Sequence, residues 1–181
     1  MTDPYPTVDP GDAWRESERS RSVLADPGPT RVLGHTLLFE PVEGTAVDGA
    51  DRFAFASALS FETPLPPGVA PTVRPMVVSA AEAAFADRLR ERGLASIDRG
   101  RHERLRTDTA RRARLRRFTA EFDTGDDSPA VPVEAWVAVW AAAGQFRVAG
   151  GAYPTANPRG DAAVSPGRYR DELLAFVRAV E

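Results

Sequence analysis

The chain has 181 residues, a length typical of one domain, and its 43% hydrophobic and 27% charged residues are ordinary values for a globular protein. It contains no cysteine, which excludes disulfides, thiolate metal sites and a cysteine nucleophile. The net charge is −3 at pH 7, and all 23 basic residues are arginine, a lysine-free usage that fits a high-GC coding bias.

Residues 1–30 are predicted to form an N-terminal extension of the domain. They mix Pro, Gly, Asp, Ser and Arg around Trp14, and we expect them to be partly ordered or to form a short helix between Asp12 and Ala25, which would have no continuous apolar stripe. The start, MTDPYPTVDPGDAW, has acids and prolines where a secretory signal has a basic and then an apolar run. No apolar stretch approaches the ~18 residues of a membrane span. We therefore expect a cytoplasmic protein without a membrane span, in which residues 31–181 form a single domain.

Two strands are predicted at the start of this domain. The run RVLGHTLLFEPV is rich in β-forming residues and ends near Pro41. The run RFAFASALSFE alternates, with small residues on one face and large ones on the other: Phe53, Phe55, Leu59 and Phe61. Residues 43–51 between the two strands suit a hairpin loop.

A helix is predicted after a proline-rich segment. TPLPPGVAPTVRP, residues 63–75, is expected to be an extended loop because proline removes backbone donors and fixes φ. The helix is then expected to begin at Ser79, where Glu82 completes a capping box. Gly93 suits the left-handed residue that ends it. An apolar stripe at i, i+4, i+8 follows one face: Ala81, Phe85 and Leu89.

Positive charge is concentrated in residues 99–117. Nine arginines stand against Glu103 and Asp108, a local balance of +7, while the rest of the chain carries −10. The segment has no continuous apolar face as a helix, so we expect a two-stranded hairpin that turns at residues 108–110. A change of phase towards Phe118 suggests a β-bulge near Arg116. On this hairpin the even-numbered arginines share one side: Arg104, Arg106, Arg112, Arg114 and Arg116.

Residues 131–154, VPVEAWVAVWAAAGQFRVAGGAYP, match two structures. The spacing i, i+3, i+4, i+7 of an apolar helical face is present at Val133, Trp136, Val137 and Trp140. Alternating Val and Trp, the AAAG break and the run QFRVAG favour a hairpin instead, and a strand is our prediction for residues 133–140. Trp136 and Trp140 would then share one face, which we interpret as core packing, with Val133, Ala135 and Val137 on the other.

A final helix is predicted from Ser165 and Pro166, with proline at its first position. Its apolar stripe is strong and needs a sheet to cover: Tyr169, Leu173, Phe176, Val177 and Val180. The element order is β-β-α-β-β-β-β-α, and short connections imply antiparallel neighbours. We expect an α+β fold with a single antiparallel sheet of about six strands packed with two main helices.

This order, with a terminal amphipathic helix after the hairpin WVAVWAAAGQFRVAGGAYP, resembles the PsbP-like fold over roughly residues 31–181. That fold is shared by extrinsic photosystem subunits, a small-GTPase-binding nuclear import factor and some bacterial lipoproteins. The resemblance implies a binding or accessory protein and assigns no functional residues. The chain departs from the exported members in showing no export signal.

The search for catalytic motifs gives none: the sequence has no GxSxG, Walker-type loop, GxGxxG or HExxH. Its two histidines, His35 and His102, lie far apart in the sequence. His35 alternates with apolar neighbours, as a half-buried structural histidine does. No catalytic residue, metal ligand or cofactor is therefore predicted.

The arginines leave two interpretations open. They form either a solvated face paired with acids from elsewhere or a surface for an acidic protein or small anion. Nucleic acid is disfavoured because no aromatic residue interleaves residues 99–117. Our leading hypothesis is a non-enzymatic binding or accessory domain. The alternative is a small enzyme for an anionic substrate, which requires His35 or a carboxylate in one pocket with several arginines. No sequence feature assigns an oligomeric state.

Overall fold

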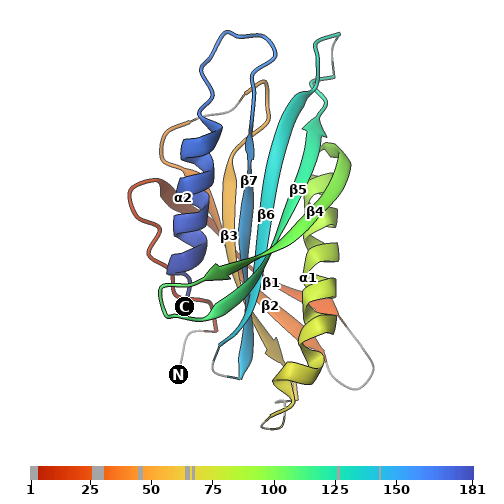
Figure 1. Ribbon diagram of the computed structural model, residues 1–181, viewed down its shortest axis with the longest axis vertical. Coiled ribbons are helices and arrows are strands. Elements are labelled where there is room, and N and C mark those ends of the chain that lie inside the picture. The colour runs from red at the N-terminus through yellow and green to blue at the C-terminus, as the bar shows by residue number, and fades with distance from the viewer. Residues whose placement is uncertain are drawn as a thin grey trace.

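The computed structural model describes residues 4–25, 31–44, 47–63, 66, 68–125, 127–142 and 144–181. Its strands are β1 (Trp14–Ala25), β2 (Val32–Pro41), β3 (Phe53–Phe61), β4 (Leu94–Arg106), β5 (Arg112–Phe122), β6 (Val131–Ala142) and β7 (Gln145–Pro154). Its helices are α1 (Ala70–Glu91) and α2 (Pro166–Ala179). The strands form one antiparallel sheet in the order β1-β2-β3-β7-β6-β5-β4, and the helices lie on its two faces (Figure 1). The expected class, one antiparallel sheet with two helices, is confirmed.

The sheet has seven strands where about six were expected. The additional strand is β1, which replaces the short helix expected between Asp12 and Ala25 and pairs antiparallel with β2. It is an edge strand, and edge strands carry charged side chains that discourage further pairing. Its run of Arg, Glu and Ser therefore shows no apolar face in the sequence, although Trp14 at its start is buried. Residues 1–3 and 26–30 of the expected extension lie outside the described residues.

Helix α1 begins at Ala70, nine positions before the expected start at Ser79, so the extended loop expected over residues 63–75 is wrong for its last part. Pro71 lies in the first turn, where the N–H that proline lacks would have no partner in the helix. The end of the helix is confirmed, because Gly93 has φ +82° and donates its N–H to the Arg90 carbonyl oxygen at 2.9 Å. Glu82 is consequently not a capping residue; it lies within the helix and is buried.

Strand β6 confirms the prediction for residues 133–140. Trp136 and Trp140 face α2, while Val133, Ala135 and Val137 face α1. The strand lies inside the sheet between β5 and β7 and is buried on both faces. A strand buried on both faces reads as a continuous apolar run, so its sequence also matched a helical period.

The two faces of the sheet differ in side-chain size. The large residues of β3 face α1, as expected, and the small ones, including Ala54 and Ala56, face α2. On the neighbouring strand β7, a Cβ at Gly151 would lie 2.8 Å from Leu173 Cδ1 of α2 and 2.1 Å from the Phe53 carbonyl oxygen. Glycine at this position therefore lets α2 pack close to the middle of the sheet. Residues 4–13 cover the same face beside α2 through Tyr5 and Val8.

The apolar stripe of α2 packs against the sheet as predicted, and all five of its residues are buried. Arg52 adds a charged contact to this face. Its side chain is 3% exposed, pairs with Glu172 of α2 at 2.5 Å, and lies over the rings of Tyr169 at 4.0 Å and Trp14 at 5.0 Å. Helix α2 is thus held by an apolar stripe and by one buried ion pair.

Replacing Phe176 with alanine is expected to lower the free energy of unfolding by about 3–5 kcal/mol, as truncation of a large core residue does. Phe176 is 3% exposed and contacts the rings of Phe39 and Trp14. Urea unfolding monitored by circular dichroism measures the change. Ala175→Ser, at an exposed position of the same helix, should stay within about 0.5 kcal/mol of wild type. A Phe176→Ala variant as stable as this control would show that α2 is not docked.

The Arg52–Glu172 pair predicts a dependence of stability on pH. Burial raises the pKa of Glu172, but hydrogen bonds from Arg168 and Arg52 outweigh it, and the pKa lies below its ordinary value of 4.5. A lowered folded-state pKa stabilises the fold above the unfolded pKa, and this stability is lost as pH falls through the folded value. Glu172→Gln should cost about 3 kcal/mol near neutral pH, and the cost should shrink below about pH 4.5. A cost that is constant in urea titrations across this range would contradict the prediction; the exposed Asp171→Asn is the control.

Candidate functional site

The arginine-rich segment forms the expected hairpin of β4 and β5. Its turn is held by hydrogen bonds that link Thr107 to Arg111 and Ala110, and Ala110 takes the left-handed conformation with φ +60°. The tip is also anchored to α2, because the Asp108 N–H donates to the Arg178 carbonyl oxygen at 2.9 Å. This bond satisfies a carbonyl group that the end of a helix otherwise leaves without a partner. The hairpin tip is therefore held by its turn and by α2.

The hairpin has two bulges, and one of them lies in the ladder at Arg116, where a bulge was expected, with its extra residue on the partner strand β4. The register shifts lie between Ala95 and Asp98 and between Arg99 and His102, each with one extra residue on β4. Such bulges bend a strand and increase its twist. Figure 1 shows the result: the hairpin curves across the molecule, and its tip lies near the C-terminal end of α2.

The structure places the five even-numbered arginines on one side of the hairpin. Their odd-numbered neighbours Leu105, Ala113 and Leu115 point the other way, into the core on the α2 side. Two pairs of arginines lie directly opposite each other across the two strands: Arg104 with Arg114, and Arg106 with Arg112. Like charges in directly opposed positions destabilise a sheet.

Arg116 is neutralised inside the molecule. Its guanidinium Nη2 lies 3.0 Å from Oε2 of the buried Glu82 of α1, and its Nη1 donates to the Gly100 carbonyl oxygen at 2.8 Å. The other Glu82 oxygen lies 2.7 Å from His102 Nε2, and Arg114 Nη2 lies 2.8 Å from His102 Nδ1. A guanidinium can only donate, so Nδ1 accepts and the ring proton is on Nε2, which donates to Glu82. We call these four side chains, Arg114, His102, Glu82 and Arg116, the Glu82 network.

Beyond this network the hairpin carries exposed cations. Arg104, Arg106 and Arg112 are exposed, and no acidic side chain pairs with them among the residues that the structure describes. Arg74 of α1 reaches the same place, where its Nη2 donates to the Arg112 carbonyl oxygen at 3.3 Å. We call the surface formed by Arg104, Arg106, Arg112 and Arg114 the arginine face. Arg116 therefore has an internal acid, whereas Arg104, Arg106 and Arg112 have none among the described residues.

His35 is not brought together with these arginines. It is buried on β2 on the α2 side, with its ring 5.4 Å from that of Tyr5. Three strands separate β2 from β5, a distance of about 19 Å at the usual strand spacing. A cavity of about 390 Å³ on the α1 side is lined by neither His35 nor any of the five hairpin arginines. His35 therefore does not share a pocket with the hairpin arginines, while the cavity holds two carboxylates, Glu18 and Glu91, together with Arg88 and Arg92.

A second polar cluster, which no sequence pattern indicated, lies on the α2 side. The Tyr153 hydroxyl donates to Glu134, the Trp136 indole donates to the same carboxylate at 2.9 Å, and Arg117 pairs with it at 2.7 Å. Burial, and then the hydrogen bond with Glu134, raise the pKa of the Tyr153 hydroxyl. The hydroxyl therefore stays protonated and the cluster is satisfied internally, which is the pattern of a structural site. Arg117 faces away from the arginine face.

The sequence did not predict that Glu82 is the acid beneath Arg116. The position of Glu82 could have indicated that it is buried, because it shares a face of α1 with the buried residues Val78, Phe85 and Leu89. A carboxylate on an apolar helix face needs a buried cation, and the arginines offer one. Within the described ranges, no three His, Asp or Glu side chains converge as a metal site needs, and neither helix is long and apolar enough to cross a membrane.

Comparison with known proteins gives one family. The family model described as a domain of unknown function, DUF6517, matches residues 9–181. The search of curated proteins gave no match.

Replacing Glu82 with glutamine should lower the free energy of unfolding by about 1–3 kcal/mol, because Arg116 and His102 keep their positions but lose a charged acceptor. The matched control is Asp87→Asn on the same helix, whose carboxylate also pairs with an arginine, Arg90, but is 69% exposed. Exposed pairs of this kind contribute about 0–1 kcal/mol. Chemical denaturation compares the two, and equal losses would contradict a special role for the Glu82 network.

Proposed function

We propose that this chain, which belongs to the DUF6517 family, is a non-enzymatic binding or accessory domain whose arginine face recognises an acidic protein. One observation carries the proposal: Arg104 lies opposite Arg114 and Arg106 opposite Arg112, and no acid among the described residues pairs with the exposed members. Opposed like charges cost some tenths of a kcal/mol per pair. A carboxylate-rich partner would remove this cost on binding.

The contrast within the hairpin supports this interpretation. Where the arginine side passes α1, Glu82 neutralises Arg116. Further along, α1 reaches the same side with another arginine, Arg74, and no described acid pairs with Arg104, Arg106 or Arg112, although the chain has 26 acidic residues. Guanidinium groups bind carboxylates through two parallel hydrogen bonds, which gives such a face selectivity for acidic side chains.

The rigidity of the tip favours binding as well. Its turn is closed by the Thr107 hydrogen bonds, and Asp108 is tied to α2. A surface held in place before association loses little conformational entropy when a partner arrives. The arginine face is therefore preorganised, and much of the electrostatic attraction is available for affinity and for the rate of association.

An acidic protein suits this face better than the other anions. The cavity lining includes none of its arginines, and a small anion normally needs a concave site. Single-stranded nucleic acid normally stacks on aromatic side chains, and none interleaves residues 99–117. The element order also resembles the PsbP-like fold, whose members are binding and accessory proteins.

Replacing Arg104, Arg106 and Arg112 together with glutamine tests the proposal. At low salt the free energy of unfolding should stay constant or rise, because like-charge repulsion is removed. Binding of a fluorescein-labelled octaglutamate peptide, measured by fluorescence anisotropy, should weaken at least tenfold. Binding to wild type should also weaken as salt rises through about 0.1 M, where the Debye length is about 10 Å.

The control removes the same charge elsewhere, as Arg15→Gln, Arg21→Gln and Arg90→Gln, all at exposed positions. It should keep most of the peptide affinity. If both triple variants lose affinity equally, the attraction reflects net charge and the arginine face has no special role. A hairpin triple variant that is less stable and still binds the peptide would favour a solvated face, and tighter binding of a thymidine oligonucleotide than of the peptide would favour nucleic acid.

A further inference from the structure

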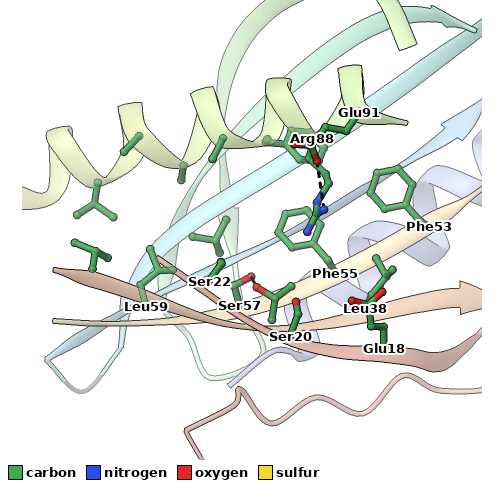
Figure 2. A pocket seen from close by; sticks show the side chains of 18 of the residues that line it. Glu18, Ser20, Ser22, Leu38, Phe53, Phe55, Ser57, Leu59, Arg88 and Glu91 are labelled. Atoms are coloured by element: carbon green, nitrogen blue, oxygen red, sulfur yellow. Dashed lines mark hydrogen bonds and ion pairs between the residues drawn. The ribbon is translucent and has the colours of Figure 1, made fainter. Parts of the chain in front are cut away.

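A cavity of about 390 Å³ lies between α1 and the strands β1, β2 and β3 (Figure 2). It exists because α1 packs mainly on β4 and β6 and faces this part of the sheet with small side chains, among them Ala80, Ala81 and Ala84. Its volume falls in the range of small-molecule sites, about 300–1,000 Å³. The opposite face of the same strands is covered by residues 4–13 and α2.

The walls of the cavity are mostly apolar. Phe55, Leu59 and Val148 from the sheet meet Val77 and Phe85 from α1. Figure 2 shows Phe55 and Leu59 on the floor of the cavity, beneath the helix. An apolar wall of this kind gains free energy by contact with an apolar molecule that would otherwise be exposed to water.

A strip of hydroxyl groups crosses the floor on the side of β1. Ser20 and Ser22 come from β1, Thr36 from β2 and Ser57 from β3. The Thr36 and Ser57 hydroxyls lie 2.7 Å apart and satisfy each other. The strip is uncharged and therefore does not select between charged and neutral ligands.

The charged residues of the cavity lining lie at one end, and Arg92 is one of them. Its guanidinium lies 4.0 Å from the centre of the Phe53 ring, is only partly exposed, and has no hydrogen bond or ion pair among the described residues. Burial, and then the neighbouring charge of Arg88, lower the pKa of Arg92, although a guanidinium stays protonated in proteins. Arg92 is thus a partly desolvated cation that makes no direct ion pair or side-chain hydrogen bond among the described residues.

The other charged groups at this end are already satisfied or solvated. Arg88 reaches into the cavity and pairs with Glu91 at 3.3 Å (Figure 2). Glu18 lies exposed on the edge strand β1, and its carboxylate, like those of Asp51 and Glu40, acts on Arg92 without a direct ion pair. An anion that entered here would pair with Arg92, because Arg92 makes no direct ion pair while Arg88 already pairs with Glu91.

We propose that this cavity binds an amphiphile with one unbranched apolar chain and a carboxylate head. The head pairs with Arg92, and the chain lies along Phe55 towards Leu59 and Val148. A carboxylate restores to Arg92 the charge partner that burial denies it, through bidentate hydrogen bonds. The apolar chain fills a space that the alanines of α1 leave open. A carboxylate without the chain would leave the apolar space empty, and a chain without the carboxylate would leave Arg92 without an ion pair.

This inference is independent of the arginine face. The cavity lies over β1, β2 and β3, and the hairpin of β4 and β5 forms the opposite edge of the sheet. Either proposal can therefore fail without the other.

The test compares three molecules with the same chain and different heads: decanoate, 1-decanol and decylammonium. Isothermal titration calorimetry on the full chain, below the micelle concentration of each, gives their dissociation constants. We expect decanoate to bind at least tenfold more tightly than decanol, as a charge-assisted hydrogen bond allows, and decylammonium most weakly. Absence of decanoate binding, or equal affinity for all three heads, would overturn the proposal.

Two matched pairs of variants locate the site. Ala84→Phe fills the cavity and should abolish binding of decanoate and decanol, while Ala83→Phe, at the neighbouring exposed position of α1, should leave both unchanged. Arg92→Gln should weaken decanoate at least tenfold and leave decanol unchanged, with Arg90→Gln as control. Ala81→Leu serves as a second filling variant if thermal unfolding shows that Ala84→Phe does not fold. Loss of binding in Ala83→Phe, or decanoate affinity untouched by Arg92→Gln, would contradict the site.

Discussion

The structure depends on one packing constraint: two helices must cover both faces of a seven-stranded sheet. A helix is about 10 Å wide with its side chains, while seven strands at their usual spacing extend about 29 Å between the outermost two. One helix on each face cannot cover that width. The α2 side closes with the help of residues 4–13 and of the hairpin tip, which brings Leu105 and Ala113 into the core. The α1 side is not closed, and the cavity over β1, β2 and β3 remains.

The same constraint decides which arginines find partners. The even-numbered side of β5 passes under α1 only in part, and there a single carboxylate, Glu82, serves both Arg116 and His102. Further along the hairpin α1 contributes another arginine, Arg74, and no described acid pairs with Arg104, Arg106 or Arg112. The acid that α1 supplies to this side of the hairpin is therefore used at Arg116 and His102.

The amino-acid sequence predicted those elements whose two faces differ in character. Helix α2 and strand β5 alternate between buried and exposed positions, strand β3 alternates between large and small side chains, and each was located. Strand β1 was missed because an edge strand with a largely solvated face carries no apolar pattern. The start of α1 was missed because Pro71 and Pro75 suggest a loop, but Pro71 lies in the first turn, which tolerates proline, and the helix continues through Pro75. For the same reason Glu82 was assigned to a cap.

For the candidate site, the sequence predicted only that the even-numbered arginines lie on one side of the hairpin. The alternation of side chains along a strand identifies this side. The register that places Arg104 opposite Arg114, however, depends on two bulges of β4. In the first bulge Ser96 has φ +51°, although it is not glycine. Nothing local marks such positions. The cavity was not predictable at all, since it arises from how far α1 lies from β1, β2 and β3. That distance is a property of the assembled layers and not of any segment.

The pairing of β3 with β7 has a consequence for how the chain folds. β1, β2 and β3 pair as neighbours in sequence, and so do β4, β5, β6 and β7, so each group can form from local contacts. Phe53 and Ala152, which face each other where the groups join, are separated by most of the chain. Closing so long a loop carries an entropic cost and slows the step that requires it. We therefore expect the two groups to form as separate units before the β3–β7 seam closes. The cavity, whose walls come from both β3 and β7 as well as α1, is completed only in that last step.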